Sequence, residues 1–440
     1  MSHSEAFRRS RRRFLAGGLA TGLAGAAWWL RPEAMATGHN SYFTDLNAAL
    51  EQAGLARPTL VVDHQRLLAN LARLRDHLGQ RYQLRLVAKS LPSLPLLKEL
   101  MTLAETRRLM VFHQPFLNQL AREVHDADLL LGKPLPVAAA RVFFERFATE
   151  CGCDEAISHG GFDPAQQIQW LVDSPARLQQ YGALAAELSQ PMRISIELDI
   201  GLHRGGIQSL AELTDMLTQI QSSPWLSFSG FMGYEPHIVK VPGRAKRWRD
   251  RAMARYQTFV TAAEAQLGHS LADLTLNTGG STTYQLYADA PTDVPVNELA
   301  VGSGLVMPTD FDLPTLADHS PAAFIATPVL KVIARNQIPG VPGLGRLQQW
   351  WNPNRAQALF IYGGNWLAQP ASPPGLTPNP VYGRSSNQEL LNAAATVKLR
   401  PDDRVFLRPT QSEHVFLQFG DIAIYDSEQR VISGYWPVLG

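Results

Sequence analysis

Residues 84–90 have the sequence LRLVAKS, and the rest of the chain is organised around this stretch. Leu84, Leu86 and Val87 form the apolar pattern of a short buried β-strand. The strand ends at Lys89, which places an amine at the mouth of whatever the strand lines. A desolvated lysine is partly neutral and nucleophilic, as a Schiff base to a carbonyl compound requires. The ordinary alternative is a lysine whose charged end reaches solvent from a strand end.

Length and composition indicate a folded protein with a sizeable core. The chain has 440 residues, which suggests two domains, or one large barrel with a smaller partner domain. Apolar residues make up 45% of the chain and charged residues 18%. The net charge is +1, and residues 1–36 carry six arginines and two glutamates, so the remainder is slightly acidic. This balance gives no indication of binding to nucleic acid or to an anionic membrane surface.

Residues 1–36 have the pattern of a targeting segment. SRRRFL at residues 10–15 fits the twin-arginine export pattern, and a moderately apolar stretch rich in glycine and alanine follows at 14–30. AMA at residues 34–36 fits a signal-peptidase site, so we expect a cleaved, periplasmic protein with no membrane attachment. The twin-arginine route carries folded proteins, and a cofactor loaded in the cytoplasm would explain its use. The alternative is an N-terminal anchor, for which the stretch is weakly apolar.

The chain has two cysteines, Cys151 and Cys153. A single C-x-C pair is neither a disulfide framework nor a four-ligand zinc site. We expect neither cysteine to take part in the chemistry, and the alternative is a local disulfide between the two.

From residue 59 the chain alternates between strand-like and helix-like patterns. A strand at 59–62 precedes an amphipathic helix at 64–79, and the strand that ends at Lys89 follows. Seven further strands are predicted at 108–113, 128–132, 168–173, 193–200, 229–235, 274–278 and 298–302, most of them followed by a helical pattern. Eight alternating units imply an α/β fold with a parallel (β/α)₈ TIM barrel.

After about residue 318 the chain becomes rich in short β-like runs. Strands are predicted at 323–333, 357–362, 394–399, 404–407 and 421–425, with irregular stretches at 335–356 and 368–386. Turn signals at this density favour a small antiparallel β domain. We expect the Trp350–Trp351 pair to act as a packing plug. The predicted boundaries are a signal at 1–36, an N-terminal segment at 37–64, the barrel at 65–317 and the β domain at 318–440.

Two glycine- and serine-rich loops follow the last two barrel strands. Residues 278–282 have the sequence TGGST, and residues 302–304 have the sequence GSG. Phosphate tends to bind in barrels at the loops after strands 7 and 8, where backbone N–H groups and hydroxyls converge on an anion. The candidate anion-binding residues are Thr278, Gly279, Gly280, Ser281, Thr282, Gly302 and Ser303. Merely flexible loops are the alternative.

Two more strand ends carry polar side chains to the same rim. Residues 197–206 have the sequence ELDIGLHRGG, which places Arg204 after the fifth barrel strand. Tyr234 lies at the end of the sixth strand and His237 follows it, and a histidine there suits proton transfer near neutral pH. Alone, Arg204 is equally compatible with a surface ion pair, and His237 with a hydrogen-bonded loop histidine.

Taken together, these motifs resemble the fold-type III pyridoxal phosphate enzymes. The motifs are RLVAKS at 85–90, DxGxxRxG at 199–206, YxxH at 234–237 and TGGST at 278–282. They are most similar to those of the D-threonine aldolase and D-serine dehydratase group, which is related to alanine racemase. The resemblance spans about residues 58–426.

The resemblance implies a barrel of alanine-racemase type with a C-terminal β domain, on which the 37–64 segment packs, and a homodimer. It implies that Lys89 holds pyridoxal 5'-phosphate as a Schiff base, with Tyr234 and the two loops completing the cofactor site. Arg204 would face the pyridine nitrogen, where a guanidinium can only donate and so holds the ring unprotonated. His237 would be the base on the substrate side.

One segment departs from the family pattern. Metal-dependent members carry Pro-x-His-x-Cys or Pro-x-His-x-Asp, whereas residues 409–414 have the sequence PTQSEH. Gln411 and Glu413 thus occupy the ligand positions, with His414 available after a register shift. This pair is poor for zinc and suits Mn²⁺ or Mg²⁺ better. Without a metal, Gln411 or Glu413 would contact the substrate directly.

The sequence therefore predicts a lyase acting on D-amino acids with a β-hydroxyl group. Such a lyase either cleaves the substrate to glycine and an aldehyde or removes water and ammonia to give a keto acid. One alternative is an amino-acid racemase that uses Lys89 as one of two bases. The other is a protein that binds pyridoxal phosphate without catalysis.

Overall fold

The computed structural model describes residues 31–33, 38–151, 161–337, 340–341 and 343–440. The twin-arginine motif and Cys153 lie outside these residues, and Cys151 ends helix α6 (Val137–Cys151). Within the described ranges, no helix combines the length and the apolar character needed to cross a membrane.

The chain divides into two compact units. Among the described residues, one unit contains those between 31 and 47, 54–58 and those between 326 and 407, and the other contains 48–53, those between 59 and 325, and 408–440. The domain boundaries drawn from the sequence stay predictions.

The larger unit is built on a closed parallel barrel of eight strands, as predicted. In order these are β2 (Gln83–Val87), β3 (Arg108–Val111), β4 (Asp128–Leu131), β5 (Ile168–Val172), β6 (Met192–Leu198), β7 (Leu226–Gly233), β8 (Thr275–Thr278) and β9 (Glu298–Val301). The barrel is closed because its last strand, β9, pairs in parallel with its first strand, β2, with Gln83 opposite Glu298.

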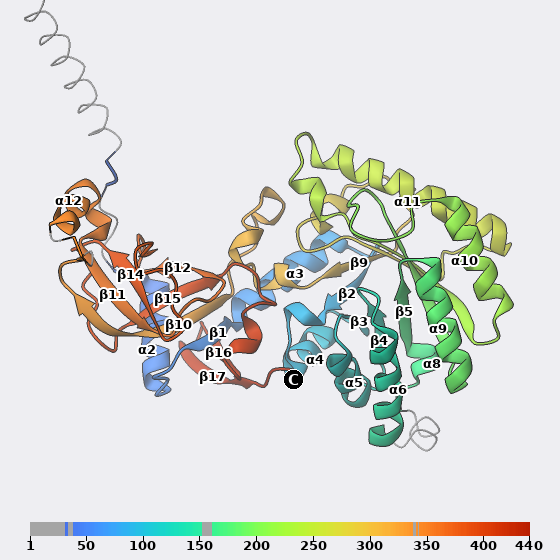
Figure 1. The fold of residues 1–440 in the computed structure, drawn as a ribbon, viewed down its shortest axis with the longest axis horizontal. Coiled ribbons are helices and arrows are strands. Elements are labelled where there is room, and N and C mark those ends of the chain that lie inside the picture. The colour runs from blue at the N-terminus through green and yellow to red at the C-terminus, as the bar shows by residue number, and fades with distance from the viewer. Residues whose placement is uncertain (1–30, 34–37, 152–160, 338–339, 342) are drawn as a thin grey trace, which may run out of the picture. The chain divides into compact units, whose positions relative to one another are not determined.

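Helices follow most of the barrel strands and lie outside them (Figure 1). Their bounds are α3 (His64–Leu78), α4 (Leu94–Leu103), α5 (Gln114–Glu123), α6, α8 (Pro164–Gln167), α9 (Pro175–Leu188), α10 (Leu210–Ser222) and α11 (Ala245–Leu267). Between β8 and β9 the chain forms only the short 3₁₀ helix η3 (Tyr284–Tyr287).

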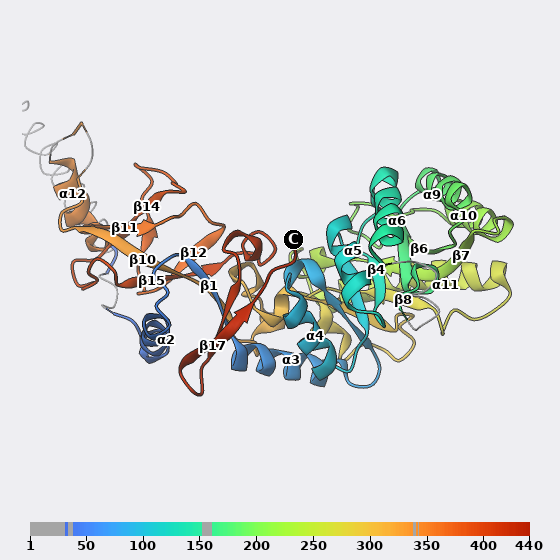
Figure 2. The same cartoon turned by 90° about the horizontal axis from the view of Figure 1, so that it is seen from below.

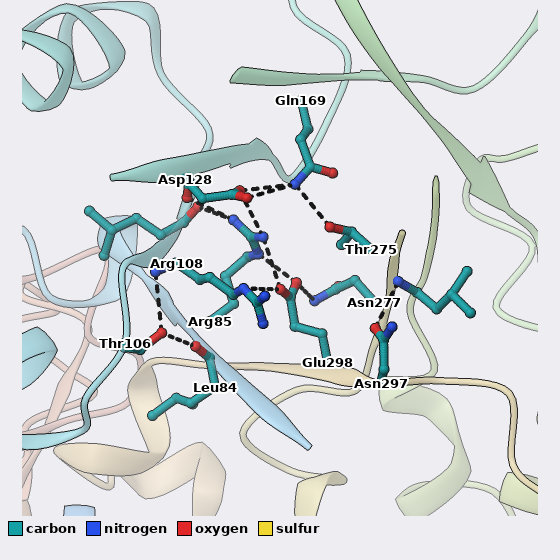
Figure 3. A network of polar contacts seen from close by, with 12 residues as sticks. Leu84, Arg85, Thr106, Arg108, Asp128, Gln169, Thr275, Asn277, Asn297 and Glu298 are labelled. Carbon is teal, nitrogen blue, oxygen red and sulfur yellow. Dashed lines mark hydrogen bonds and ion pairs between the residues drawn. The ribbon is translucent and has the colours of Figure 1, made fainter. Parts of the chain in front are cut away.

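The amino ends of the barrel strands are filled by charged and amide side chains (Figure 3). The Arg85 guanidinium is fully buried and contacts Glu298 at 2.5 Å and Asp128 at 2.9 Å. Asn277 donates to the same Glu298 carboxylate at 2.8 Å. Burial of this many charges requires mutual pairing, so the network acts as one polar layer of the core.

A small sheet accompanies the barrel in the larger unit. Strand β1 (Thr59–Asp63) pairs in parallel with β16 (Ile422–Asp426), and β17 (Val431–Trp436) pairs with β16 in antiparallel fashion. Asp63 also caps α3, because its carboxylate accepts from the backbone N–H of Arg66. Strand β1 therefore stays outside the barrel and leads directly into its first helix.

The other unit contains an antiparallel sheet in the order β13-β14-β11-β10, and β15 pairs with both β10 and β12. The bounds are β10 (Ala323–Ile333), β11 (Gln357–Tyr362), β12 (Ala368–Ser372), β13 (Thr377–Pro378), β14 (Gln388–Ala393) and β15 (Arg404–Pro409). Helix α2 (Ser41–Gln52) accompanies this sheet (Figure 2), with the rings of Phe43 and Phe406 4.9 Å apart.

Three expectations for the C-terminal half were wrong. Residues 394–399 are not a strand, because the Gln357 amide takes the carbonyl oxygens of Ala394 and Val397, and the strand is β14 instead. The 335–356 and 368–386 stretches, expected to be irregular, contain helix α12 (Leu344–Trp351) and strands β12 and β13, respectively. Trp350 and Trp351 lie on α12 and are 56% and 39% exposed, so they do not fill a core among the described residues.

Candidate active site

A cavity of about 230 Å³ opens among the carboxyl ends of the barrel strands. This is the face where barrel enzymes place their catalytic groups. Eleven of the residues singled out from the sequence line it: Lys89, Arg204, Tyr234, Gly279, Gly280, Ser281, Thr282, Gly302, Ser303, Gln411 and Glu413. Residues from separate strand ends thus line one cavity, and their roles in a functional site stay a prediction.

Three of the candidate residues do not line the cavity. Thr278 is buried behind the loop, His414 is exposed, and His237 lies beside Gly201. The Nε2 atom of His237 lies 3.3 Å from the point where a Cβ on Gly201 would stand. Its Nδ1 atom is buried without a hydrogen-bond partner among the described residues. Burial, partly opposed by the Glu235 charge, lowers the pKa of His237 and favours the neutral imidazole.

Lys89 sits in the 3₁₀ turn η1 (Ala88–Ser90) that ends β2. Its Nζ atom lies 4.5 Å from the centre of the Phe112 ring and 3.3 Å from Oε1 of Glu413. The side chain is 39% exposed, so the desolvation assumed from the sequence is only partial. The amine nevertheless projects into the cavity and faces a carboxylate.

Glu235 shapes the loop after β8. This fully buried carboxylate accepts from the Thr278 hydroxyl at 2.7 Å, the Gly279 N–H at 3.2 Å and the Thr283 hydroxyl at 2.8 Å. Thr278 and the Gly279 N–H are therefore occupied within the protein and support the loop from behind. The sequence analysis missed Glu235, although it lies in the quoted segment between Tyr234 and His237.

Ser281 ties the two predicted anion-binding loops together. Its hydroxyl oxygen accepts from the backbone N–H groups of Gly302 at 3.2 Å and Gly304 at 2.9 Å. The hydroxyl proton of Ser281 stays available for donation. Among the described residues, the backbone N–H groups of Ser281 and Thr282 have no hydrogen-bond partner, so they are free to bind an anion.

Tyr234 packs its ring against the same loop. A Cβ on Gly280 would stand 2.8 Å from the Tyr234 ring, so only glycine permits this approach. Burial raises the pKa of Tyr234 to about 12, with the Glu235 charge adding to the shift and Arg204 opposing it. The phenol is therefore protonated at neutral pH and serves as a donor. The Arg204 guanidinium lies 5.0 Å from the centre of the Tyr234 ring.

The loop that presents Arg204 is held by Asp199. The buried carboxylate accepts from the backbone N–H groups of Gly201 and His203 at 3.0 Å and contacts Nδ1 of His203 at 2.7 Å. Burial would raise the pKa of Asp199, but these hydrogen bonds prevail and lower it. The positive φ angles of Gly201 (119°) and His203 (56°) allow the tight turn.

Glu197 is a second acidic group that the sequence analysis missed. It lies on β6, with a carboxylate oxygen 3.5 Å from the point where a Cβ on Gly205 would stand. Burial raises the pKa of Glu197 to about 7, against the attraction of Arg204. The signal in the sequence was a glutamate between the apolar residues Ile196 and Leu198 near the end of the strand.

The 409–414 segment does not fit a divalent metal. The Gln411 side-chain nitrogen donates to Asp310 at 2.9 Å, and Glu413 is engaged by Lys89 at 3.3 Å. Within the described part of the chain, no three His, Cys, Asp or Glu side chains are grouped as a metal ion requires. His414 does not supply a replacement ligand, since it lies outside the cavity.

The comparisons with known proteins identify the family. The model of the family "Alanine racemase, N-terminal domain" matches residues 62–310, which is more than half of the chain. The protein belongs to this family, and the resemblance to fold-type III pyridoxal phosphate enzymes is confirmed.

Solved structures share the fold at low sequence identity. D-threonine aldolase from Filomicrobium marinum is 15% identical with a TM-score of 0.68, over 87% of this chain and 95% of that one. D-threo-3-hydroxyaspartate dehydratase from Delftia sp. HT23 is 16% identical with a TM-score of 0.64, over 88% and 98%. Alanine racemase from Bacillus anthracis is 13% identical with a TM-score of 0.61, over 87% and 98%. A search of curated proteins found no match.

Proposed function

We propose that the protein is a pyridoxal 5'-phosphate enzyme acting on D-amino acids with a β-hydroxyl group. The observation that carries this proposal is the cavity itself. An amine, a guanidinium and two donor-rich loops face one space at the carboxyl ends of the barrel strands. Membership of the alanine racemase family supports the cofactor, and the aldolase and dehydratase structures support the substrate class.

The cavity residues fit the parts of this cofactor. Lys89 would hold it covalently, and the Ser281 hydroxyl with the Ser281 and Thr282 N–H groups would bind the phosphate. Gly302 would let that loop approach, because a Cβ there would stand 2.8 Å from Cβ of Val87. Tyr234 would donate from its protonated phenol.

The chain's own groups would then control the chemistry. The bound cofactor withdraws electrons from the substrate's Cα, which eases breaking of the bonds to that carbon. Arg204 would donate to the pyridine nitrogen, which moderates this withdrawal because guanidinium does not give up its proton. Lys89, once released by the substrate amine, would move a proton at Cα. Phe112 would cover one side of the amine and limit water there.

The test is a panel of D- and L-amino acids incubated with purified, cofactor-loaded protein. Aldehyde, keto acid and inversion at Cα are scored separately, by coupled reduction, by a keto-acid assay and by chiral chromatography. We expect aldehyde or keto acid from D-β-hydroxy amino acids and none from their L-enantiomers. Inversion alone would indicate the racemase, and bound cofactor with no turnover would indicate a binding protein.

We also propose export by the twin-arginine route and assembly as a homodimer. The first rests on the arginine motif at residues 10–15 and the second on the family resemblance. Sedimentation equilibrium of the mature protein tests the second, and a monomer over the working concentration range would exclude it.

A further inference from the structure

We propose that Glu413 is the catalytic base that takes the β-hydroxyl proton of the substrate, in the place that the metal-dependent family pattern gives to a metal ion. This inference rests on the proposed function and deepens it, because it selects carbon–carbon cleavage and a reaction independent of divalent metals.

The step balances as follows in atoms and electrons. The substrate's O–H bond breaks and its proton passes to Glu413. A carbonyl group forms at Cβ as the Cα–Cβ bond breaks, and an aldehyde leaves. The electron pair of that bond remains with Cα, which takes up a proton from Lys89, so that glycine is the second product. Glu413 then returns its proton to Lys89, whose Nζ atom lies 3.3 Å from Oε1 of Glu413. Pyridoxal phosphate is the co-reactant that the proposed function already supplies.

The position of Glu413 carries the argument. Its Oε1 atom lies 3.3 Å from Nζ of Lys89 inside the cavity. The substrate's amino nitrogen must take over the position of the lysine nitrogen on the cofactor. Only two carbon atoms separate that nitrogen from the β-oxygen, so a carboxylate this close to Lys89 is within reach of the β-hydroxyl.

Two serine hydroxyls fix the other oxygen of the carboxylate. Ser303 and Ser412 each lie 3.2 Å from Oε2 of Glu413, and their own oxygens are 2.9 Å apart. Ser412 is fully buried and Ser303 nearly so, whereas the Glu413 side chain is 26% exposed. The carboxylate is therefore anchored through Oε2, and Oε1 is presented to the reacting amine.

The contacts of Glu413 agree with the role of an acceptor. Its Oε1 atom faces the amine of Lys89 at 3.3 Å, and its Oε2 atom faces two serine hydroxyls at 3.2 Å. A carboxylate whose two oxygens both face donors accepts hydrogen bonds and has no proton to donate. This favours taking the hydroxyl proton, which leads to cleavage, over protonating the hydroxyl group for its loss as water.

The described side chains around Glu413 do not form a metal site. No three His, Cys, Asp or Glu side chains of the described residues are grouped as a metal ion requires, and Gln411 adds only a neutral amide, whose nitrogen donates to Asp310 at 2.9 Å. Oε2 of Glu413 is held by two serine hydroxyls, and Oε1 faces the amine of Lys89. The altered 409–414 sequence thus builds a base where the family pattern builds a metal site.

Two other groups compete for the role. Asp310 also lines the cavity, but it is an exposed side chain engaged by Gln411. His237 is neutral and able to accept, but it does not line the cavity. The three candidates can be told apart by replacing each of them in turn with an uncharged amide residue.

The experiment compares the mature, cofactor-loaded protein with Glu413→Gln, Asp310→Asn and His237→Gln, and with Glu428→Gln as an exposed control. Aldehyde release from D-threonine is measured after dialysis against EDTA and again with Mn²⁺. Exchange of the α-proton of D-alanine into D₂O reports the cofactor and Lys89 without the β-hydroxyl step. Metal retained after Mn²⁺ incubation and gel filtration is measured by mass spectrometry.

We expect EDTA and Mn²⁺ to leave wild-type aldehyde release unchanged, with no Mn²⁺ retained. Glu413→Gln should lower kcat for aldehyde release by about 10²- to 10⁴-fold, the usual effect of losing a general base. It should still bind the cofactor and exchange the α-proton of D-alanine, which a variant with a collapsed site would not do. Asp310→Asn and His237→Gln should lose far less, and Glu428→Gln nothing.

Several results would overturn the inference while leaving the lyase intact. These are loss of aldehyde release in EDTA with recovery in Mn²⁺, full cleavage by Glu413→Gln, an equal loss in Asp310→Asn or His237→Gln, and keto acid as the wild-type product. By contrast, a wild type that binds the cofactor but converts no D-β-hydroxy amino acid contradicts the proposed function itself.

Discussion

At Lys89, a single nitrogen is proposed to connect the protein to its cofactor. Lys89→Ala should therefore abolish the visible absorption band of the covalently held cofactor and reduce turnover at least about 10³-fold, since both the attachment and a proton-transfer group are lost. Lys98→Ala, an exposed position on α4, is the matched control. Absorption spectra of both proteins after incubation with pyridoxal phosphate decide the matter. A persistent band in Lys89→Ala would place the attachment elsewhere.

At Glu197, the raised pKa makes a prediction about stability. The native state keeps this proton up to a pH of about 7, whereas the unfolded chain loses it near 4.5. Folding stability therefore falls as the pH rises across this window. Glu197→Gln removes the effect, so it should be more stable than the wild type at pH 8, by about 1–3 kcal/mol, with little difference at pH 4.

Urea denaturation of the wild type, Glu197→Gln and the exposed control Glu428→Gln at both pH values measures this difference. An equal pH dependence in the wild type and Glu197→Gln would show that the carboxyl group is not responsible.

Some site residues could be predicted from the sequence because the local strand pattern places them, and others could not because only tertiary contacts place them. Lys89 and Arg204 each follow a predicted barrel strand, and the carboxyl ends of barrel strands converge, so we expected these two residues to lie near one another. The Lys89–Glu413 contact joins segments far apart in the chain, and no local pattern encodes it. The roles of Glu235 and Glu197 depend on burial, which sequence position alone does not fix.

At the level of elements, the loop after β8 can approach the Tyr234 ring only because residue 280 is a glycine without a side chain. Gly280→Ala would bring a Cβ to 2.8 Å from the Tyr234 ring, which must move. We expect the affinity for pyridoxal phosphate to fall about tenfold or more, at least ~1.4 kcal/mol, with the fold retained. Gly434→Ala, which meets only an ordinary contact at 3.6 Å, is the control. Fluorescence titration with the cofactor measures both, and equal affinities would contradict the close approach.

The polar layer of the barrel is a stability element. Arg85→Met would leave the Glu298 carboxylate, 2% exposed, without its main partner. Removing one partner of a buried ion pair typically costs about 3–5 kcal/mol. Arg141→Met disrupts an exposed pair with Glu187 and should stay close to the wild type. Chemical denaturation compares the two, and similar stabilities would mean that the layer relaxes around the loss.

The barrel elements were predictable because each is a short apolar run followed by a helical repeat. The β unit was harder. Its strands include amide-rich and proline-containing segments such as β12 and β13, whose pairing comes from neighbours and not from their own composition. The 394–399 run has strand-like residues, but its carbonyl groups are claimed by Gln357. Tertiary hydrogen bonds overrode local propensity in that case.

At the scale of the whole molecule, the fold and the reaction are specified by different amounts of sequence. Structures only 13–16% identical share the barrel over most of the chain, since the fold needs mainly an apolar pattern. They carry different activities in their names, so the reaction must depend on few residues. In this chain the 409–414 segment departs from the family pattern, and it is there that the structure places Glu413 opposite Lys89.

The proposed export route is tested on the whole chain. The proposed cofactor would be held by residues from at least four barrel strands and could be bound only after folding, and the twin-arginine pathway accepts folded proteins. Arg11→Lys with Arg12→Lys keeps the charge of the segment but removes the planar guanidinium groups. We expect this precursor to accumulate in the cytoplasm, folded and cofactor-bound. The pair Arg8→Lys with Arg9→Lys, just upstream, should be exported normally. Cell fractionation with cofactor absorbance in each fraction measures the outcome, and normal export of the Arg11/Arg12 variant would indicate another route or an anchor.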